Sequence, residues 1–204
     1  MNISTMNFYQ IFLPIATLLY LMLVFVLRSV ILWKKTGVNP FVFGNTDKAH
    51  DYIGRVYKVM VLFTWVSIGC YSFFPSIYDY LMPIDYLENG ELRVSGLILL
   101  IVSFLWTSIA QYQMSNSWRI GIDYEETTDL ISNGLFKYSR NPIFLGVLIS
   151  YLGTFLIIPN ILSFSTLLMT FVTIQTQVRL EEEYLESVLG NDYLNYKKSV
   201  RRWL

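Results

Sequence analysis

The residues best suited to chemistry stand at the two ends of one long apolar stretch. They are Arg140, Asn141, Arg179, Glu181 and Glu182. The stretch between them, 142–178, is twice as long as a membrane crossing of about 20 residues. It should fold back at Ile158-Pro159-Asn160, because proline ends a helix and asparagine favours a turn. The ends of this hairpin then meet, and the sequence predicts a polar pocket of guanidinium, amide and carboxylate groups at the membrane surface.

The charges of this pocket indicate an anion beside Arg140. Asn141 is the expected N-cap and Pro142 the first residue of the following helix. A cation near the positive end of a helix dipole is unfavourable unless an anion lies between them. An anionic ligand group would provide this anion, and so would a phospholipid head group.

Three successive carboxylates lie at the far end of the hairpin, Glu181, Glu182 and Glu183. They spread over about 200° of a helix, so at least one should point inward if the helix packs on anything. The alternative is that Arg179 with Glu183, and Glu182 with Glu186, form ordinary pairs on the helix surface.

Other kinds of chemistry find little support. The chain has 1 cysteine and 1 histidine, too few for the nitrogen and sulfur sites that zinc prefers, so no metal is expected. We interpret His50 as a solvated loop residue and Cys70 as a small packing residue. The sequence contains no glycine-rich phosphate loop, no HExxH motif and no serine nucleophile elbow.

The composition is that of a membrane protein. Of the 204 residues, 54% are hydrophobic and 15% charged, against roughly 25% charged in soluble domains. The mean hydropathy of +0.45 requires a lipid bilayer as a second apolar solvent. The 15 basic and 15 acidic residues cancel, so no basic field would attract nucleic acid.

The charge-free runs predict an all-α, polytopic fold of about five transmembrane helices. We expect them at about 9–32, 58–80, 94–114, 142–158 and 161–179, with a C-terminal cytoplasmic helix afterwards. The chain is treated as one membrane domain, 1–204, in which 1–112 provides three helices and 113–204 carries the chemistry.

The loop charges predict the orientation. The first loop, the segment 115–141 and the C-terminus share nearly all the basic residues, whereas the opposite side holds only Arg93. Since positive loops stay in the cytoplasm, the N-terminus should be outside and the C-terminus inside.

Two motifs then allow a comparison with a known family. One reads Thr128-Asp-Leu-Ile-Ser-Asn-Gly-Leu-Phe-Lys-Tyr-Ser-Arg-Asn-Pro-Ile-Phe144, and the other reads Glu181-Glu182-xx-Leu185-xxx-Leu189-Gly190-xx-Tyr193-xx-Tyr196. With the hairpin between them, they resemble the isoprenylcysteine carboxyl methyltransferase family and its phospholipid methyltransferase relatives, whose pattern is RHPxY, a hydrophobic hairpin and EE. The resemblance covers about residues 113–204. The ending 196–204 and the segment Asn116-Ser-Trp118 are similar to the short prokaryotic members, which implies a prokaryotic cytoplasmic membrane.

The resemblance implies an S-adenosylmethionine-dependent methyltransferase that acts on a lipophilic small molecule or a prenylated or lipid acceptor. It implies that Arg140, Arg179 and Glu182 are catalytic, with Arg140 complementing the methionyl carboxylate. The residues it implies for the cofactor are Thr128, Asp129, Leu130, Ile131, Phe136, Asn141, Pro142, Ile143, Phe144 and Glu181. Positioning of an activated methyl donor requires no metal.

The sequence also departs from the family pattern. The motif histidine is Asn141, which cannot titrate near neutrality, and the motif tyrosine is Phe144. An arginine that contacts the substrate carboxylate in the prenylcysteine enzymes is Gln177 here. Arg179 is the nearest substitute, but it is two residues along the helix from Gln177. Such residues point about 200° apart, almost to opposite faces of the helix. Two other functions remain open: a non-catalytic membrane scaffold or transport component, and a nicotinamide-dependent enzyme similar to the sterol reductases.

Overall fold

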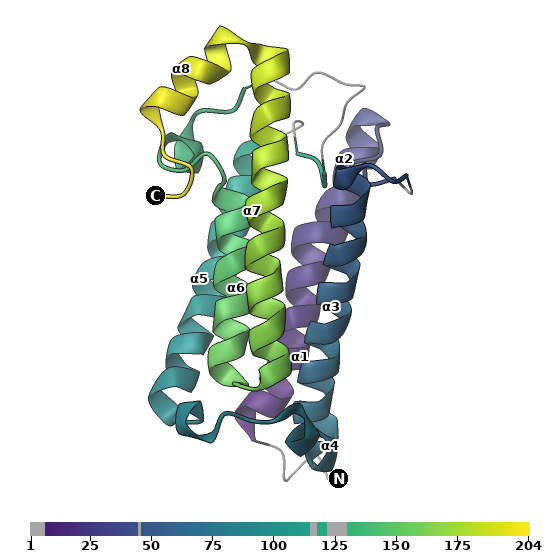
Figure 1. Cartoon of the computed structure of the whole chain (residues 1–204), viewed down its shortest axis with the longest axis vertical. Helices are drawn as coiled ribbons and strands as arrows, with labels where there is room; N and C mark the ends of the chain where they lie inside the picture. The colour runs from purple at the N-terminus through teal and green to yellow at the C-terminus, as the bar shows by residue number, and fades with distance from the viewer. Residues whose placement is uncertain (1–6, 45, 115–117, 122–129) are drawn as a thin grey trace.

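The structure is a computed structural model that describes residues 7–44, 46–114, 118–121 and 130–204. Long helices run along one axis of the molecule, and α8 folds over one end (Figure 1). The helices are α1 (Phe8–Tyr20), the π-helix η2 (Leu21–Leu27), α2 (Arg28–Thr36), α3 (Ala49–Phe73), α4 (Pro75–Tyr78), α5 (Gly90–Met114), α6 (Pro142–Ile157), α7 (Ile161–Leu189) and α8 (Asn191–Ser199), with short 3-10 helices η3 (Asp79–Leu81), η4 (Asp85–Leu87) and η6 (Gly134–Lys137).

The expected all-α membrane fold is confirmed. Four helices in the described part are long and apolar enough to cross a bilayer: Phe8–Thr36, Ala49–Phe73, Gly90–Met114 and Ile161–Leu189. The fifth predicted crossing, α6, has 16 residues and is the shorter arm of the hairpin with α7. Since α7 has 29 residues, it extends for about 43 Å at 1.5 Å per residue, well beyond the hydrocarbon thickness of about 30 Å. Its charged C-terminal end therefore leaves the apolar layer.

The hairpin turn lies where proline and asparagine predict it. Asn160 caps α7, because its Oδ1 accepts from the Ser163 amide at 2.9 Å. Its Nδ2 donates to Ser67 Oγ of α3 at 3.0 Å, and the Ile84 amide donates to the Pro159 carbonyl at 2.8 Å. Asn160 is fully buried. Buried polar groups that are all bonded fix this end of the hairpin to α3 and to the segment after α4.

The α5 and α6 helices approach closely because glycines face each other. A Cβ added at Gly96 would lie 2.6 Å from the Gly153 carbonyl, and one at Gly153 would lie 2.8 Å from the Gly96 carbonyl. Two helical turns from this contact, Ser103 Oγ donates to the Gly146 carbonyl at 2.8 Å. Small residues and hydroxyl bonds of this kind join helices in lipid, where no hydrophobic force does so.

The interpretation of His50 as a solvated loop residue was wrong. His50 lies in the first turn of α3 and is 5% exposed, with the Phe43 ring stacked on it at 4.5 Å between centroids. Next to it, Asp51 accepts from the Gly44 and Thr46 amides at 2.7 and 3.0 Å. The carboxylate orders the loop before α3, so this helix begins at Ala49 rather than near 58. Cys70 is half-buried beside the apolar core, which agrees with a packing role.

Candidate functional site

The site is organised around the guanidinium of Arg140, directly before α6. Its Nε and Nη2 donate to Oε1 of Glu182 on α7 at 3.2 and 2.9 Å. Its Nη1 donates to the carbonyls of Lys197 and Val200, beyond the end of α7. The side chains of Arg140 and Glu182 are 8% and 5% exposed. The anion beside Arg140 is therefore a protein carboxylate, and not the ligand group or phospholipid head group that the sequence suggested.

A second cation binds the same carboxylate. Arg202 donates from Nε to Glu182 Oε1 at 3.0 Å and from Nη2 to Oε2 at 2.7 Å. We refer to Arg140, Glu182 and Arg202 as the Glu182 ion cluster. The Glu182 carboxylate raises the pKa of Arg202 through these bonds. Paired charges in a buried place are stable only when their hydrogen bonds are satisfied, and here four bonds satisfy one carboxylate.

The last residues of the chain are bonded to the start of α6. The Arg140 amide donates to the Arg201 carbonyl at 2.9 Å, and the Ser139 hydroxyl and Asn141 Nδ2 both donate to the Arg202 carbonyl at 3.3 Å. Asn141 stands at the N-cap position as predicted but makes no side-chain cap bond; its Nδ2 makes the contact with Arg202.

A buried phenol holds α8 against η6. Tyr196 donates its hydroxyl to the Phe136 carbonyl at 2.6 Å, and burial raises the pKa of Tyr196 to about 12. The phenol therefore stays protonated and keeps its donor throughout the physiological range. Together with the Glu182 ion cluster, this bond closes η6, α6, α7 and α8 into one unit.

The two remaining charged candidates lie differently. Glu181 is half-buried, and its carboxylate makes no hydrogen bond or ion pair with any residue that the structure describes. Arg179 is exposed, and its Nη1 donates to the carbonyl and Oε1 of Gln175 at 2.6 and 3.0 Å, within its own helix. The structure thus joins Glu182 with Arg140 and does not join Arg179 with either of them.

The other described candidates for cofactor binding lie between Leu130 and Phe136 and at the start of α6. Phe136, Asn141 and Pro142 are buried, and the others that can be described are half-buried: Leu130, Ile131, Ile143 and Phe144. Thr128 and Asp129, the first two residues of this predicted set, lie outside the described residues.

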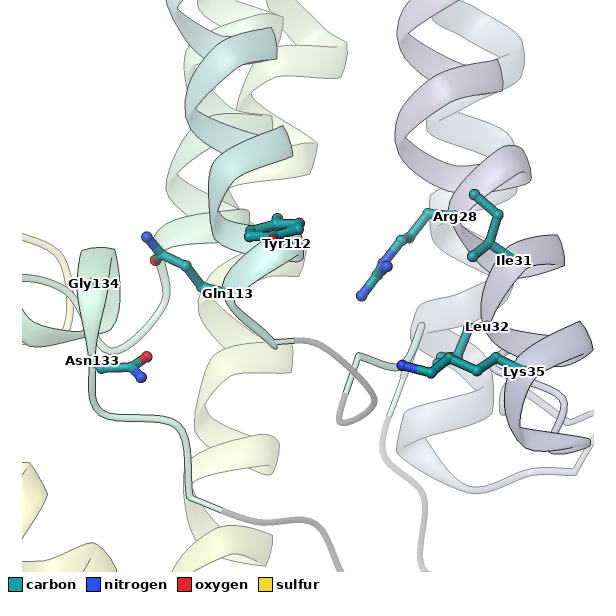
Figure 2. A pocket seen from close by; sticks show the side chains of 8 residues that line it. All are labelled: Arg28, Ile31, Leu32, Lys35, Tyr112, Gln113, Asn133 and Gly134. Carbon is teal, nitrogen blue, oxygen red and sulfur yellow. The ribbon is translucent and has the colours of Figure 1, made fainter.

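An open cleft adjoins η6 on the side of α2. It has a volume of about 660 Å³, within the range of small-molecule sites. Arg28, Ile31, Leu32 and Lys35 of α2 line it on one side, and Tyr112, Gln113, Asn133 and Gly134 on the other. Figure 2 shows the side chains of Arg28 and Tyr112 extending toward each other across the gap. We refer to this space as the α2–α5 cleft.

Comparison with known proteins gives the family. Residues 92–192 match the family model described as phospholipid methyltransferase. Over 110 residues the chain is 31% identical to protein-S-isoprenylcysteine O-methyltransferase A of Arabidopsis thaliana, and over 112 residues it is 30% identical to the enzyme of that name from Saccharomyces cerevisiae. Residues 92–192, about half of the chain, belong to the phospholipid methyltransferase family.

The matches cover part of each methyltransferase. Both alignments take in 52% of this chain, and they span 55% of the Arabidopsis protein and 46% of the yeast protein. The chain thus spans about half the length of the curated relatives it matches. A 63-residue stretch is also 38% identical to the whole of a Haemophilus influenzae protein.

A solved structure shares the fold of this methyltransferase-family chain. It is that of the eukaryotic intramembrane Ras methyltransferase, isoprenylcysteine carboxyl methyltransferase, with a TM-score of 0.58 at 20% identity. The likeness covers 85% of this chain and 58% of the other. It extends further than the sequence matches and therefore includes part of the N-terminal helices.

The family match contains Arg140 and Glu182 but stops before Tyr196 and Arg202. Sequence reasoning missed a site role for Arg202, which entered only the count of loop charges. One signal could have found it: an inward carboxylate needs cations, and Arg201 and Arg202 are the only adjacent pair of arginines in the chain.

Proposed function

We propose that this chain is an integral membrane methyltransferase that uses S-adenosylmethionine and acts on a lipophilic acceptor. The observation that carries the proposal is the joining of the two family motifs, Arg140-Asn141-Pro142 and Glu181-Glu182, by the Glu182 ion cluster at the polar end of the hairpin. The names of the relatives supply the reaction class. They favour it over the scaffold and reductase alternatives.

The residues present fit this cofactor. Because Glu182 is saturated by two arginines, Glu181 is the carboxylate of the pair that is left to bind a ligand. We assign it to a polar group of the cofactor, such as its ammonium or a ribose hydroxyl, which hydrogen-bond well to carboxylates. The apolar side chains of Leu130, Ile131, Phe136 and Phe144, with Asn141, Pro142 and Ile143, would complete the site.

In this proposal, the chain positions the reactants. When bound, S-adenosylmethionine supplies a methyl group activated by its sulfonium, so that the protein needs no nucleophile of its own. Arg140 and Glu182 are positioning residues, because their polar atoms are occupied by each other and by the chain end. Arg179 is too far around α7 to join them and stays a candidate only for an acceptor that approaches along the exposed face.

The proposed membrane placement follows from the charges. All basic residues except Arg93 belong to the side of the first loop, the segment 115–141 and the C-terminus, so we place that side in the cytoplasm and the N-terminus outside. We propose a prokaryotic cytoplasmic membrane from the resemblance of the sequence to the short prokaryotic members of the family. A water-soluble cofactor would then reach the site from the cytoplasm, and a lipophilic acceptor would reach it from the bilayer.

Binding of S-adenosylhomocysteine to the detergent-purified chain tests the proposal by calorimetry. Glu181→Gln should weaken binding by at least about tenfold, because a hydrogen bond to a charged group is worth about 1.5–3 kcal/mol. Glu183→Gln is the matched control, since Glu183 is the exposed next-but-one carboxylate of the same helix. Equal binding by the parent and Glu181→Gln would reject the site, and no binding by the folded parent would reject the function.

A further inference from the structure

The segment between α3 and α5 exposes several large apolar side chains. Tyr80, Met82 and Tyr86 are 84%, 67% and 82% exposed, and Ile77 is exposed as well. We refer to residues 74–87, which contain α4, η3 and η4, as the connecting segment. Large apolar side chains gathered on a surface mark a contact with a partner or a membrane. The position of the connecting segment relative to the bilayer decides between these two.

Backbone bonds hold the connecting segment against the turn of the α6–α7 hairpin. The Ile161 amide donates to the Met82 carbonyl at 3.3 Å, and the Ile84 amide donates to the Pro159 carbonyl at 2.8 Å. Met82 has a φ of +55°, in a region that side chains other than glycine rarely adopt, so these bonds fix its place. Figure 1 shows the segment crossing the end of the bundle at this turn. The depth of its exposed side chains in a membrane therefore follows from the depth of the turn.

The length of the hairpin arms gives the depth of the turn. Helix α6 has 16 residues and rises by about 24 Å, and α7 rises by about 27 Å from Ile161 to the exposed Arg179. An exposed cation should lie at or beyond the edge of the hydrocarbon layer, which is about 30 Å thick. Since both arms are shorter than this layer, the turn lies at or just inside the opposite edge. The connecting segment, which is bonded to the turn, then lies where hydrocarbon meets the head groups.

The side chains of the connecting segment suit this boundary. Tyrosine is enriched there because its ring is apolar and its hydroxyl is polar, and Tyr80 and Tyr86 have this character. Asp79 and Asp85, the first residues of η3 and η4, are exposed, and their carboxylates would be costly deeper in the hydrocarbon. Phe73, the last residue of α3, is also exposed. The segment thus continues the lipid-facing surface of α3 and stops at the depth that carboxylates allow.

We propose that the connecting segment lies in the head-group layer of the leaflet opposite the Glu182 ion cluster, with Tyr80, Met82 and Tyr86 in contact with lipid. In this position it covers the hairpin turn and sets the depth of the bundle in the membrane. The proposal goes beyond the predicted crossings, because it gives part of the connection between two of them a place in the bilayer. It depends neither on methyl transfer nor on which end of the molecule faces the cytoplasm.

Spin labels test this placement on the full chain in nanodiscs of phosphatidylcholine and phosphatidylglycerol, which leave both membrane faces accessible. The labels are attached one at a time to Tyr80→Cys, Met82→Cys and Tyr86→Cys, each combined with Cys70→Ser. All three labelled positions are exposed, so the substitutions should not disturb folding. The measurement compares collisions of each label with oxygen, which concentrates in lipid, and with a water-soluble nickel chelate. Frequent oxygen collisions and few nickel collisions are expected at all three positions.

Two exposed positions serve as references in the same background. Asn191→Cys follows α7, whose end lies about 15 Å beyond Arg179, and its label should behave as in water. Leu168→Cys, at a position that is 49% exposed within α7, should behave as in hydrocarbon. At Met82→Cys the ratio of oxygen to nickel collisions should be at least about tenfold higher than at Asn191→Cys, because apolar surroundings exclude a polar solute. The ratio should stay below that at Leu168→Cys.

Two other outcomes would overturn the proposal. Nickel collisions as frequent at Tyr80→Cys, Met82→Cys and Tyr86→Cys as at Asn191→Cys would place the connecting segment in water. Few collisions with either reagent would show that protein, such as a second copy of the chain, covers the segment in place of lipid. The three environments thus give three different pairs of collision rates, and only one of them agrees with a place in the head-group layer.

Discussion

Replacement of Glu182 by glutamine should release the chain end from the start of α6. The carboxylate accepts two bonds from Arg140 and two from Arg202, at 2.7–3.2 Å. Glutamine keeps one oxygen, but its NH₂ group would face the Arg202 Nη2 donor, and two cations would then lack their anion. Removal of one partner of a buried ion pair costs about 3–5 kcal/mol. Because Arg202 is 30% exposed, we expect the lower end, about 3 kcal/mol.

Hydrogen exchange measures this loss at the affected amides. The Arg140 amide donates to Arg201, and the Val200 amide to Tyr196, so both should exchange about a hundredfold faster in Glu182→Gln, at 1.36 kcal/mol per factor of ten. The control is Glu186→Gln, which removes the more exposed ion pair of Glu186 with Lys197 and should change exchange less than about fivefold. Similar exchange in the two variants would refute the reasoning, because burial would then not distinguish the two carboxylates.

Two further predictions concern stability in detergent. Tyr196→Phe removes the 2.6 Å bond to the Phe136 carbonyl and should lower the free energy of unfolding by about 1–2 kcal/mol. Tyr193→Phe, which loses no hydrogen bond to a described residue, should have a smaller effect. Equal denaturation midpoints of the two variants would contradict this prediction. Gly153→Ala places a Cβ 2.8 Å from the Gly96 carbonyl and should lower the melting temperature. In the control variant Gly69→Ala, the new Cβ would have no neighbouring atom within 4 Å, so the melting temperature should stay unchanged or rise. A melting temperature unchanged in both glycine variants would show that α5 and α6 can separate without cost.

The helices could be predicted because charged side chains are costly inside a bilayer, so that spanning segments lack them. The hairpin turn at Pro159 and Asn160 followed from local chemistry alone, and the structure confirms it. The rule failed at α3, where Asp51 and Arg55 suggested a loop. Asp51 satisfies its charge through backbone amides of the preceding loop, and no pattern of hydropathy contains such a contact. Likewise α7 continues to Leu189, because its charged end forms helix outside the apolar layer.

The site could be predicted only in part for a similar reason. Topology required Arg140 to meet the carboxylates of α7, and the structure pairs it with Glu182. The sequence does not show which of the two carboxylates, Glu181 or Glu182, pairs with Arg140, since both lie near the inward face of α7. The pairing depends on Arg202, which follows a turn and another helix after α7. Arg179 was selected by its nearness in sequence, but helical geometry directs it to the exposed side. The division of the chain at residue 112 and the cofactor roles stay predictions.

The hairpin of α6 and α7 is anchored at both ends, by Asn160 bonded to Ser67 and by Glu182 bonded to Arg140 and Arg202. Because both of its ends are held by these bonds, the hairpin should resist bending. Any lateral opening that admits a molecule from the bilayer should therefore occur by movement of the α1–α2 arm, whose π-helical segment η2 interrupts the regular bonding of the α-helix. In this arrangement, the α6–α7 hairpin would stay rigid and hold the polar side chains in place, while movement of the α1–α2 arm would control access from the bilayer.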